Sequence, residues 1–186
     1  LGARGATTPE LIGGSAALTH SNYTDIAGQT GLYQPETPEK RYLHFGVREH
    51  AMAAVLNGIA YHNSGLIPYG GTFLVFADYM RGSMRLSALS MLGVIYVLTH
   101  DSIGVGEDGP THQPIETIPS LRAMPGMLVF RPGDGNETSG AYKVAIENRT
   151  RPSAMCRSRQ GMANQANASI DKVALGGYIL EDCAGT

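Results

Sequence analysis

The sequence VIYVL at Val94–Leu98 runs directly into the polar stretch THDSIGVGEDGPTHQP at Thr99–Pro114. The first five residues are β-branched, aromatic or aliphatic, which is typical of a central parallel strand covered on both faces. The stretch that follows contains two histidines and three acids among glycines and prolines. Open α/β sheets bind ligands in loops at the carboxyl ends of their strands. The two segments together therefore predict an α/β fold with an active site after this strand.

The composition narrows the class of protein. The 186 residues are 42% hydrophobic and 16% charged, as in a single globular domain, and the net charge is -2. This balance gives no reason to expect nucleic acid or an anionic membrane as a partner. No apolar run approaches the roughly 20 residues that span a bilayer. Two cysteines do not make a disulfide framework, so we expect a soluble intracellular domain in a reducing compartment.

Strand and helix patterns alternate along the chain. Strands are expected at Glu10–Ser15, Leu66–Tyr69, Val94–Leu98, Met127–Phe130 and Ala154–Arg157. Helices are expected at Gly46–His62, from Thr72 as N-cap to about Met91, at Ile115–Met124, and at Glu137–Glu147 after a cap at Asp134 or Asn136. Pro119 must interrupt or restart the third of these helices. Ala27–Lys40 reads as a surface loop, and the run GGYILEDCAGT after Leu175 is strand-like. The alternation predicts a doubly wound, mainly parallel sheet with helices on both faces.

Glu49 lies in the first turn of the clearest helix pattern. A carboxylate there is explained by its favourable interaction with the helix dipole. The neighbouring residues Ala51–Ala54 are apolar, so the helix is expected to be buried, and a buried carboxylate can hold a proton near neutral pH. The residues alone favour the structural role, because structural acids outnumber catalytic ones.

Phe73, Phe76 and Tyr79 follow a helical spacing. An aromatic stripe of this kind is usually part of a core. The alternative is a stacking wall for a flat heteroaromatic ring. That alternative is strengthened by the preceding PYGGT, at Pro68–Thr72, whose glycines would let a ligand approach the backbone.

The loop at Thr99–Pro114 permits three interpretations. Its glycines match G-x-G-x-x-G, but acids stand where a pyrophosphate would lie and no long helix follows at once, so we reject dinucleotide binding. A metal site is conceivable but lacks a recognised ligand spacing; its donors would be His100, Asp101, Asp108, His112 and Glu116. Polar groups lining a sugar pocket fit this mixture better. Arg157 and Arg159 either anchor an anionic substrate or are solvated surface residues.

Several motifs in one order resemble those of transketolase, in particular its pyrimidine-binding domain. They are GGSA (Gly13–Ala16), FGVREHAM (Phe45–Met52), PYGGTF (Pro68–Phe73), THDSIGVGEDGPTHQPIE (Thr99–Glu116), RP-x-D-x-NE (Arg131–Glu137) and SRQ (Ser158–Gln160). The resemblance runs from about Pro9 to Leu180. It implies thiamine diphosphate and Mg²⁺ or Ca²⁺ as cofactors. It also implies transfer of a two-carbon ketol unit between sugar phosphates, as in the pentose phosphate pathway and the Calvin cycle.

The resemblance also assigns roles to individual residues. Glu49 matches the catalytic glutamate that bonds a nitrogen of the cofactor's pyrimidine ring, and this overturns the structural interpretation. Phe73, Phe76 and Tyr79 match the aromatic pocket for that ring. Ser21, His100 and Arg159 match residues that bind the phosphate of the sugar substrate. Asp108 matches a residue that binds the hydroxyl next to the carbonyl of the substrate. His112 matches a catalytic histidine that takes part in proton transfer.

Three departures from the family pattern stand out. Ala17 replaces an aspartate of the pattern GGSAD, and CRSRQGMANQ (Cys156–Gln165) differs from the usual run around SRQ. Nothing in residues 1–186 resembles the diphosphate-binding domain, which carries the metal motif, or the C-terminal domain. We therefore expect one pyrimidine-binding domain that is silent without a diphosphate-binding partner and belongs to a homodimer. The alternatives are a non-catalytic dimerisation or regulatory module and a dihydroxyacetone synthase fragment. A cytoplasmic location is expected, or a plastid in a photosynthetic source.

Overall fold

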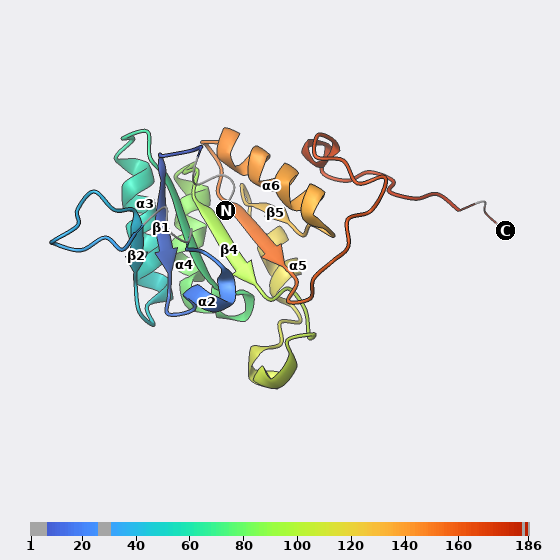
Figure 1. The fold of residues 1–186 in the computed structure, drawn as a ribbon, viewed down its shortest axis with the longest axis horizontal. Coiled ribbons are helices and arrows are strands. Elements are labelled where there is room, and N and C mark those ends of the chain that lie inside the picture. Colours follow the sequence, from blue (N-terminus) through green and yellow to red (C-terminus); the bar gives the residue numbers. More distant parts are fainter. Residues whose placement is uncertain (1–6, 26–30, 184, 186) are drawn as a thin grey trace.

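The protein folds around a six-stranded sheet, which a computed structural model describes over residues 7–25, 31–183 and 185 (Figure 1). All of its strand pairs are parallel, in the order β2-β1-β3-β4-β6-β5. The strands are β1 (Leu11–Ser15), β2 (Tyr42–His44), β3 (Ile67–Phe73), β4 (Ile95–Thr99), β5 (Leu128–Phe130) and β6 (Ser153–Arg157). The predicted parallel α/β sheet is confirmed.

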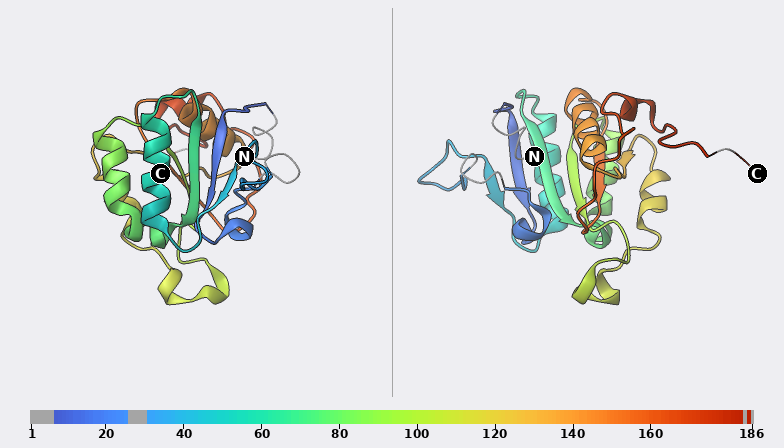
Figure 2. Two further views of the ribbon diagram at one scale, coloured as in Figure 1. Left: turned by 90° about the vertical axis from the view of Figure 1, so that its left-hand side faces the viewer. Right: turned by 45° about the vertical axis from the view of Figure 1, so that its right-hand side comes forward.

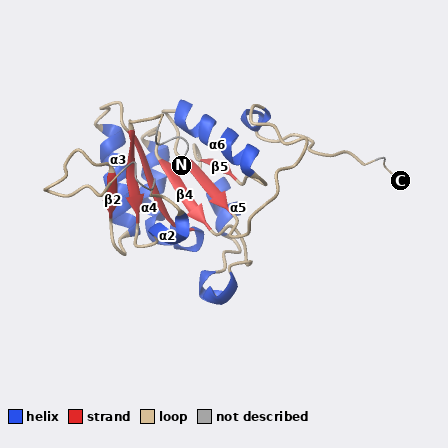
Figure 3. Cartoon of the chain, viewed as in Figure 1, coloured by secondary structure: helices blue, strands red, loops and turns tan. Residues whose placement is uncertain are grey.

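Helices cover both faces of this sheet (Figures 2 and 3). The helices are α2 (Thr19–Asn22), α3 (Glu49–Tyr61), α4 (Ala77–Leu89), α5 (Thr117–Arg122) and α6 (Gly135–Glu147). Short 3₁₀ turns are η1 (Leu74–Phe76), η2 (Gly106–Asp108), η3 (Pro110–His112) and η4 (Lys172–Leu175). One apolar core joins α3, α4 and α5 to the sheet, and a second joins α6 to the opposite face. The fold is therefore doubly wound, as predicted.

Strand β4 explains why the VIYVL sequence lacks polar alternation. Ile95 and Val97 belong to the core under α6, whereas Tyr96 and Leu98 belong to the core under α3 and α4. Every residue of the strand is buried. Alternate side chains of a strand point to opposite faces, so a strand covered on both sides needs apolar residues throughout.

Strand β3 is longer than predicted. It continues through Phe73, and α4 begins only at Ala77, so the predicted helix cap at Thr72 is wrong. A Cβ at Gly70 would stand 2.5 Å from Cδ1 of Leu56, and a Cβ at Gly71 would overlap Cγ2 of Thr24. These glycines allow close packing of buried segments, and the prediction that they admit a ligand to the backbone is not supported.

Two helix starts test the capping predictions. Asp134 is the N-cap of α6, and its Oδ1 accepts a hydrogen bond from the Glu137 amide at 2.8 Å, which confirms one of the two predicted caps. The sequence predicts that Pro119 either interrupts or restarts its helix; α5 begins at Thr117 and runs unbroken to Arg122, so the predicted interruption is wrong. Pro119 is the third residue of that helix, where a backbone N–H has no intrahelical acceptor to lose.

The remaining described segments form no further strand, although Leu32 makes an isolated parallel bridge to Tyr42 of β2. Residues 31–40 form the predicted loop, and Ala27–Thr30 of that prediction lie outside the described residues. The strand-like run after Leu175 is not a strand over residues 176–183. Among the described helices, none combines the length and the hydropathy that a membrane crossing requires.

Candidate functional site

All six strands end at one edge of the sheet, and the segments that follow them carry the predicted site residues (Figures 1 and 3). Ser21 follows β1, Glu49 follows β2, and Phe76 follows β3. His100 follows β4, and Arg159 follows β6. Parallel pairing therefore gathers residues that are up to 138 positions apart in sequence, counted from Ser21 to Arg159.

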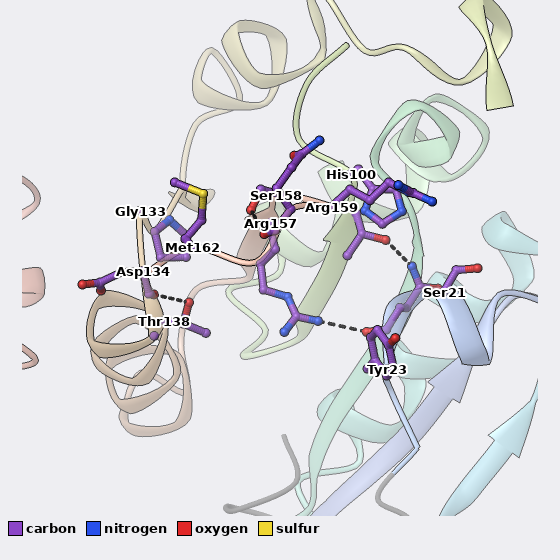
Figure 4. A pocket seen from close by; sticks show the side chains of 15 residues that line it. Ser21, Tyr23, His100, Gly133, Asp134, Thr138, Arg157, Ser158, Arg159 and Met162 are labelled. Atoms are coloured by element: carbon purple, nitrogen blue, oxygen red, sulfur yellow. Dashed lines mark hydrogen bonds between the residues drawn. The ribbon is translucent and has the colours of Figure 1, made fainter. Parts of the chain in front are cut away.

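A hollow of about 220 Å³ opens at this edge (Figure 4). Ser21, His100 and Arg159 all line it, so the structure brings together the three residues expected to hold a sugar phosphate. Asp108 and His112, predicted for the same substrate, lie in η2 and η3 and do not line this hollow. We call it the edge pocket.

A buried hydrogen-bonded cluster at the base of the edge pocket, here called the floor, consists of Ser15, Asn22 and Thr99. Asn22 and Thr99 line the pocket, and Ser15 is joined to them through its hydrogen bond to Asn22. Asn22 is fully buried, and its Nδ2 donates to Oγ1 of Thr99 at 2.6 Å and to the Thr72 carbonyl at 3.2 Å. Its Oδ1 accepts from Oγ of Ser15 at 3.1 Å. The floor therefore links the segment after β1 to the ends of β3 and β4.

Arg157 ends β6 opposite Thr99 and also lines the edge pocket. Its Nη2 donates to the backbone carbonyl of Asn22 at 2.9 Å. Its Nε is buried and has no hydrogen-bond partner among the described residues. The same is true of Nδ1 of His100. Two residues that line the pocket thus each contain a buried nitrogen atom that lacks a hydrogen-bond partner among the described residues.

The charges around His100 act in opposite directions. Burial lowers the pKa of His100, and the neighbouring Arg159 lowers it further. Asp108 and Asp101 raise it, and Arg157 lowers it. The net effect favours the neutral imidazole until an anion enters the pocket.

The outer part of the site, here called the rim, consists of Arg159 and Gln160, which line the edge pocket, and of Glu107, which pairs with Arg159. Nη2 of Arg159 lies 3.7 Å from Oε2 of Glu107, and Nε2 of Gln160 donates to the Gly104 carbonyl at 2.7 Å. The Arg159 and Glu107 side chains remain 45% and 85% exposed. Solvent weakens ion pairs of this kind, so a ligand can displace the carboxylate at little cost.

An aromatic cluster borders the edge pocket. The rings of Phe73 and Phe76 are stacked at 5.8 Å between centroids, and Tyr79 lies 5.7 Å from Phe76. His112 contacts both phenylalanines, and His100 lies 5.2 Å from Phe73. Phe73 ends a strand and Phe76 ends η1, so these residues do not form one helical stripe. Because His100 belongs to both groups, the ring cluster and the pocket are continuous.

Glu49 is 7% exposed in the first turn of α3. The helix is buried on one face only, because Ala51 and Ala54 are exposed, so the predicted burial holds for Glu49 but not for the whole segment. Helix α3 packs against α4, which carries Tyr79. Asp101, considered above as a metal ligand, pairs with Arg131 at 2.8 Å. Within the described part of the chain there is no group of three or more His, Cys, Asp or Glu residues that could hold a metal ion.

Ala17 has a positive φ of 63°, a conformation that aspartate tolerates better than alanine. It lies in a second hollow of about 500 Å³ at the same edge of the sheet, together with His20, Tyr42 and His44. The missing carboxylate of the family pattern would stand in this hollow.

The sequence interpretation missed Asn22, whose contacts come from strands far apart in the chain. A weak signal was present, since Asn22 follows a buried glycine-rich strand by only seven residues. The residues themselves did identify Arg157, together with Arg159, as a candidate anchor for an anionic substrate. The family resemblance assigned no role to Arg157.

A parallel sheet whose carboxyl edge joins a donor-rich pocket to an aromatic cluster has the architecture of α/β domains that place a ligand site at the ends of their strands. The sequence profile described as "Transketolase, pyrimidine binding domain" matches residues 1–164. The chain therefore belongs to the transketolase pyrimidine-binding domain family.

Curated relatives agree with this assignment. The transketolase of Nostoc sp. (strain PCC 7120) is 62% identical over 97% of this chain, which covers 27% of that protein. The chloroplastic transketolase of Solanum tuberosum is 59% identical over 98% of this chain, which covers 24% of it. The chain thus spans about a quarter of the length of these relatives.

Solved structures share the fold. A Pichia stipitis transketolase in complex with sedoheptulose 7-phosphate superposes with a TM-score of 0.91 at 51% identity, over 95% of this chain and 27% of that one. A split-gene transketolase, described as an inactive β4 tetramer, gives 0.66 at 28% identity, over 87% of this chain and 48% of that one.

Proposed function

We propose that this chain is the pyrimidine-binding part of a transketolase, which transfers a two-carbon ketol unit from a ketose phosphate to an aldose phosphate. The observation that carries the proposal is the continuity of the edge pocket with the aromatic cluster through His100. One part of this site suits a phosphorylated sugar and the other suits a flat ring.

The residues present fit the pyrimidine ring of thiamine diphosphate. The stacked pair Phe73–Phe76 and the exposed ring of Tyr79 offer aromatic faces for it. The buried Glu49 would hydrogen-bond a ring nitrogen. When bound, thiamine diphosphate supplies the carbon nucleophile and the electron sink for cleavage of the ketose.

The chain's own residues then have distinct tasks. Ser21, His100 and Arg159 bind the phosphoryl group and fix the register of the sugar. Asp108 accepts a hydrogen bond from the hydroxyl next to the carbonyl, and His112 moves a proton at the sugar oxygens. Phe73 and Phe76 exclude water from one side of the site.

We further propose that a diphosphate-binding domain completes the site and supplies the contacts to Mg²⁺ or Ca²⁺, and that the active assembly is a homodimer. Charge-assisted contacts contribute ~1.5–3 kcal/mol each, so the chain alone is expected to bind the cofactor poorly. Relatives include chloroplastic plant transketolases and a cyanobacterial one. A plastid or the cytoplasm is the proposed location.

The second candidate is a non-catalytic dimerisation or regulatory module, which Ala17 favours because it replaces the family's aspartate. Dihydroxyacetone synthase is a third candidate, and acceptor comparison distinguishes it. Calorimetric titration of thiamine diphosphate with magnesium, into the chain alone and mixed with a transketolase diphosphate-binding domain, separates the first two. Binding and ketol transfer in the mixture would support the enzyme component. Association of the domains without cofactor binding would support the module.

A further inference from the structure

We propose that Arg157 is a second anion-binding arginine of the edge pocket and makes it selective for a dianionic phosphoryl group, an inference that rests on the proposed function. The family resemblance places the phosphate on Ser21, His100 and Arg159 and assigns nothing to Arg157. The geometry adds this residue to the site.

The backbone fixes Arg157 at the centre of the pocket. It is paired in register with Thr99, the residue before His100. Its side chain extends from the end of β6 toward the Ser21–Tyr23 segment, with α6 on its other side (Figure 4). The hydrogen bond from Nη2 to the Asn22 carbonyl holds the guanidinium in this direction.

The guanidinium of Arg157 has unused capacity. Arginine carries five N–H donors, and the buried Nε of Arg157 has no acceptor among the described residues. Buried donors are rarely left unpaired, because the loss of hydration is not recovered. A ligand oxygen in the pocket would supply the missing acceptor.

The nearby carboxylates do not neutralise Arg157. Asp134 lines the same pocket, but its two oxygens accept from the backbone amides of Glu137 and Gln165. Glu107 is paired with Arg159 on the rim. No ion pair joins Arg157 to an acid in the described part of the chain. Its charge is thus available to a ligand.

A phosphoryl group matches this arrangement better than a carboxylate does. It carries close to two negative charges and three acceptor oxygens. Two guanidinium groups, the Ser21 hydroxyl and the His100 ring approach the pocket from three chain segments, so several oxygens can be bound together. The source is either the phosphoryl end of a sugar phosphate or inorganic phosphate, and we propose the sugar phosphate.

The test is titration of inorganic phosphate, fructose 6-phosphate and fructose into the 186-residue chain, followed by calorimetry and amide NMR shifts. Arg157→Met is compared with Arg159→Met and with Arg85→Met, which removes the same charge from an exposed position of α4. We expect Arg157→Met to weaken both phosphorylated ligands about tenfold or more, and Arg85→Met to change them less than about twofold. Fructose is expected not to bind, and fructose 6-phosphate is expected to bind more tightly than phosphate.

Several results would overturn the inference. In one such result, Arg157→Met loses no more affinity for the phosphorylated ligands than Arg85→Met does, while Arg159→Met loses affinity. Arg157 then has no role in binding, and the phosphate site of the proposed function stands. If the wild type binds neither phosphorylated ligand, the inference about Arg157 fails, whereas the proposed function is tested separately by ketol transfer in the mixture with a diphosphate-binding domain. Equal affinity for phosphate and fructose 6-phosphate would overturn the sugar phosphate as the source.

A folding control keeps the result interpretable. Near-ultraviolet circular dichroism checks whether Arg157→Met keeps the native fold. Arg157→Lys provides a second test, because lysine keeps the positive charge but not the planar guanidinium. We expect its affinity for the phosphorylated ligands to lie between those of Arg157→Met and the wild type. Wild-type affinity in Arg157→Lys would overturn a role for the guanidinium.

Discussion

The floor and the rim both contribute residues to the edge pocket, yet they are built differently. The floor is buried, and the Asn22 side chain makes three hydrogen bonds within it and to β3. The rim is exposed and depends on one long ion pair and one hydrogen bond to a loop carbonyl. Buried, fully paired polar groups fix a geometry, whereas exposed pairs contribute little to stability. We infer that the floor positions the site and the rim adapts to what enters it.

The strongest test of this comparison is Asn22→Ala. The substitution leaves the Thr72 carbonyl and the Thr99 hydroxyl without their partner, so we expect a loss of ~2–4 kcal/mol in the free energy of unfolding. Urea titration measures it. Asn167→Ala, at an exposed position, is the control and should change stability by less than ~0.5 kcal/mol. Equal values for the two variants would contradict a structural floor.

Gly71→Ala tests the packing beneath the floor. A Cβ there would overlap Cγ2 of Thr24 and lie 3.5 Å from Cβ of Asn22. Overpacking predicts a loss of ~1–3 kcal/mol, measured by thermal or urea unfolding. Gly177→Ala, which has open space around it, should not destabilise the protein. A fully stable Gly71→Ala protein would show that the floor can relax.

His100 lies between the floor and the rim, and its lowered pKa predicts a pH dependence of stability. Between the folded pKa and the unfolded value of about 6.5, the unfolded chain binds more protons. The free energy of unfolding should therefore fall as the pH decreases through this window, and the contribution of His100 to stability should be complete at pH values above it. Urea titrations at several pH values should give a shallower dependence for His100→Gln. Parallel curves would contradict the assignment.

The smallest effect is expected at the rim. Glu107→Gln removes an exposed ion pair, so the free energy of unfolding should change by less than ~0.5 kcal/mol. Release of Arg159 should tighten phosphate binding by up to about fivefold, since exposed pairs are worth ~0.2–1 kcal/mol. Calorimetry would detect this. A large loss of stability would place the rim in the same category as the floor.

Local sequence pattern predicted five of the six strands and the longer helices, but it missed the short β2 and α2. The pocket residues Ser21, His100 and Arg159 were assigned by the family resemblance and not by local pattern. VIYVL is apolar since both of its faces are covered, and Asp134 caps α6 through its own side chain. The errors at Thr72 and Pro119 have one origin. Local propensity was applied where tertiary packing or position within the helix decides the outcome.

The floor could not be found in the same way. The hydrogen bond between Asn22 and Thr99 joins residues 77 positions apart, and no periodicity in the sequence encodes their meeting. The orientation of Arg157 likewise depends on a backbone carbonyl from another segment. The residue types were visible in the sequence, but their partners were set by the sheet.

The order of the strands also bears on how this chain behaves in a crowded solution. The two outermost strands, β2 and β5, have only three residues each, while the inner strands have five to seven. A short border offers few free backbone groups to a passing strand. The sheet is therefore poorly suited to grow sideways into fibrils, and its borders act as built-in protection against aggregation.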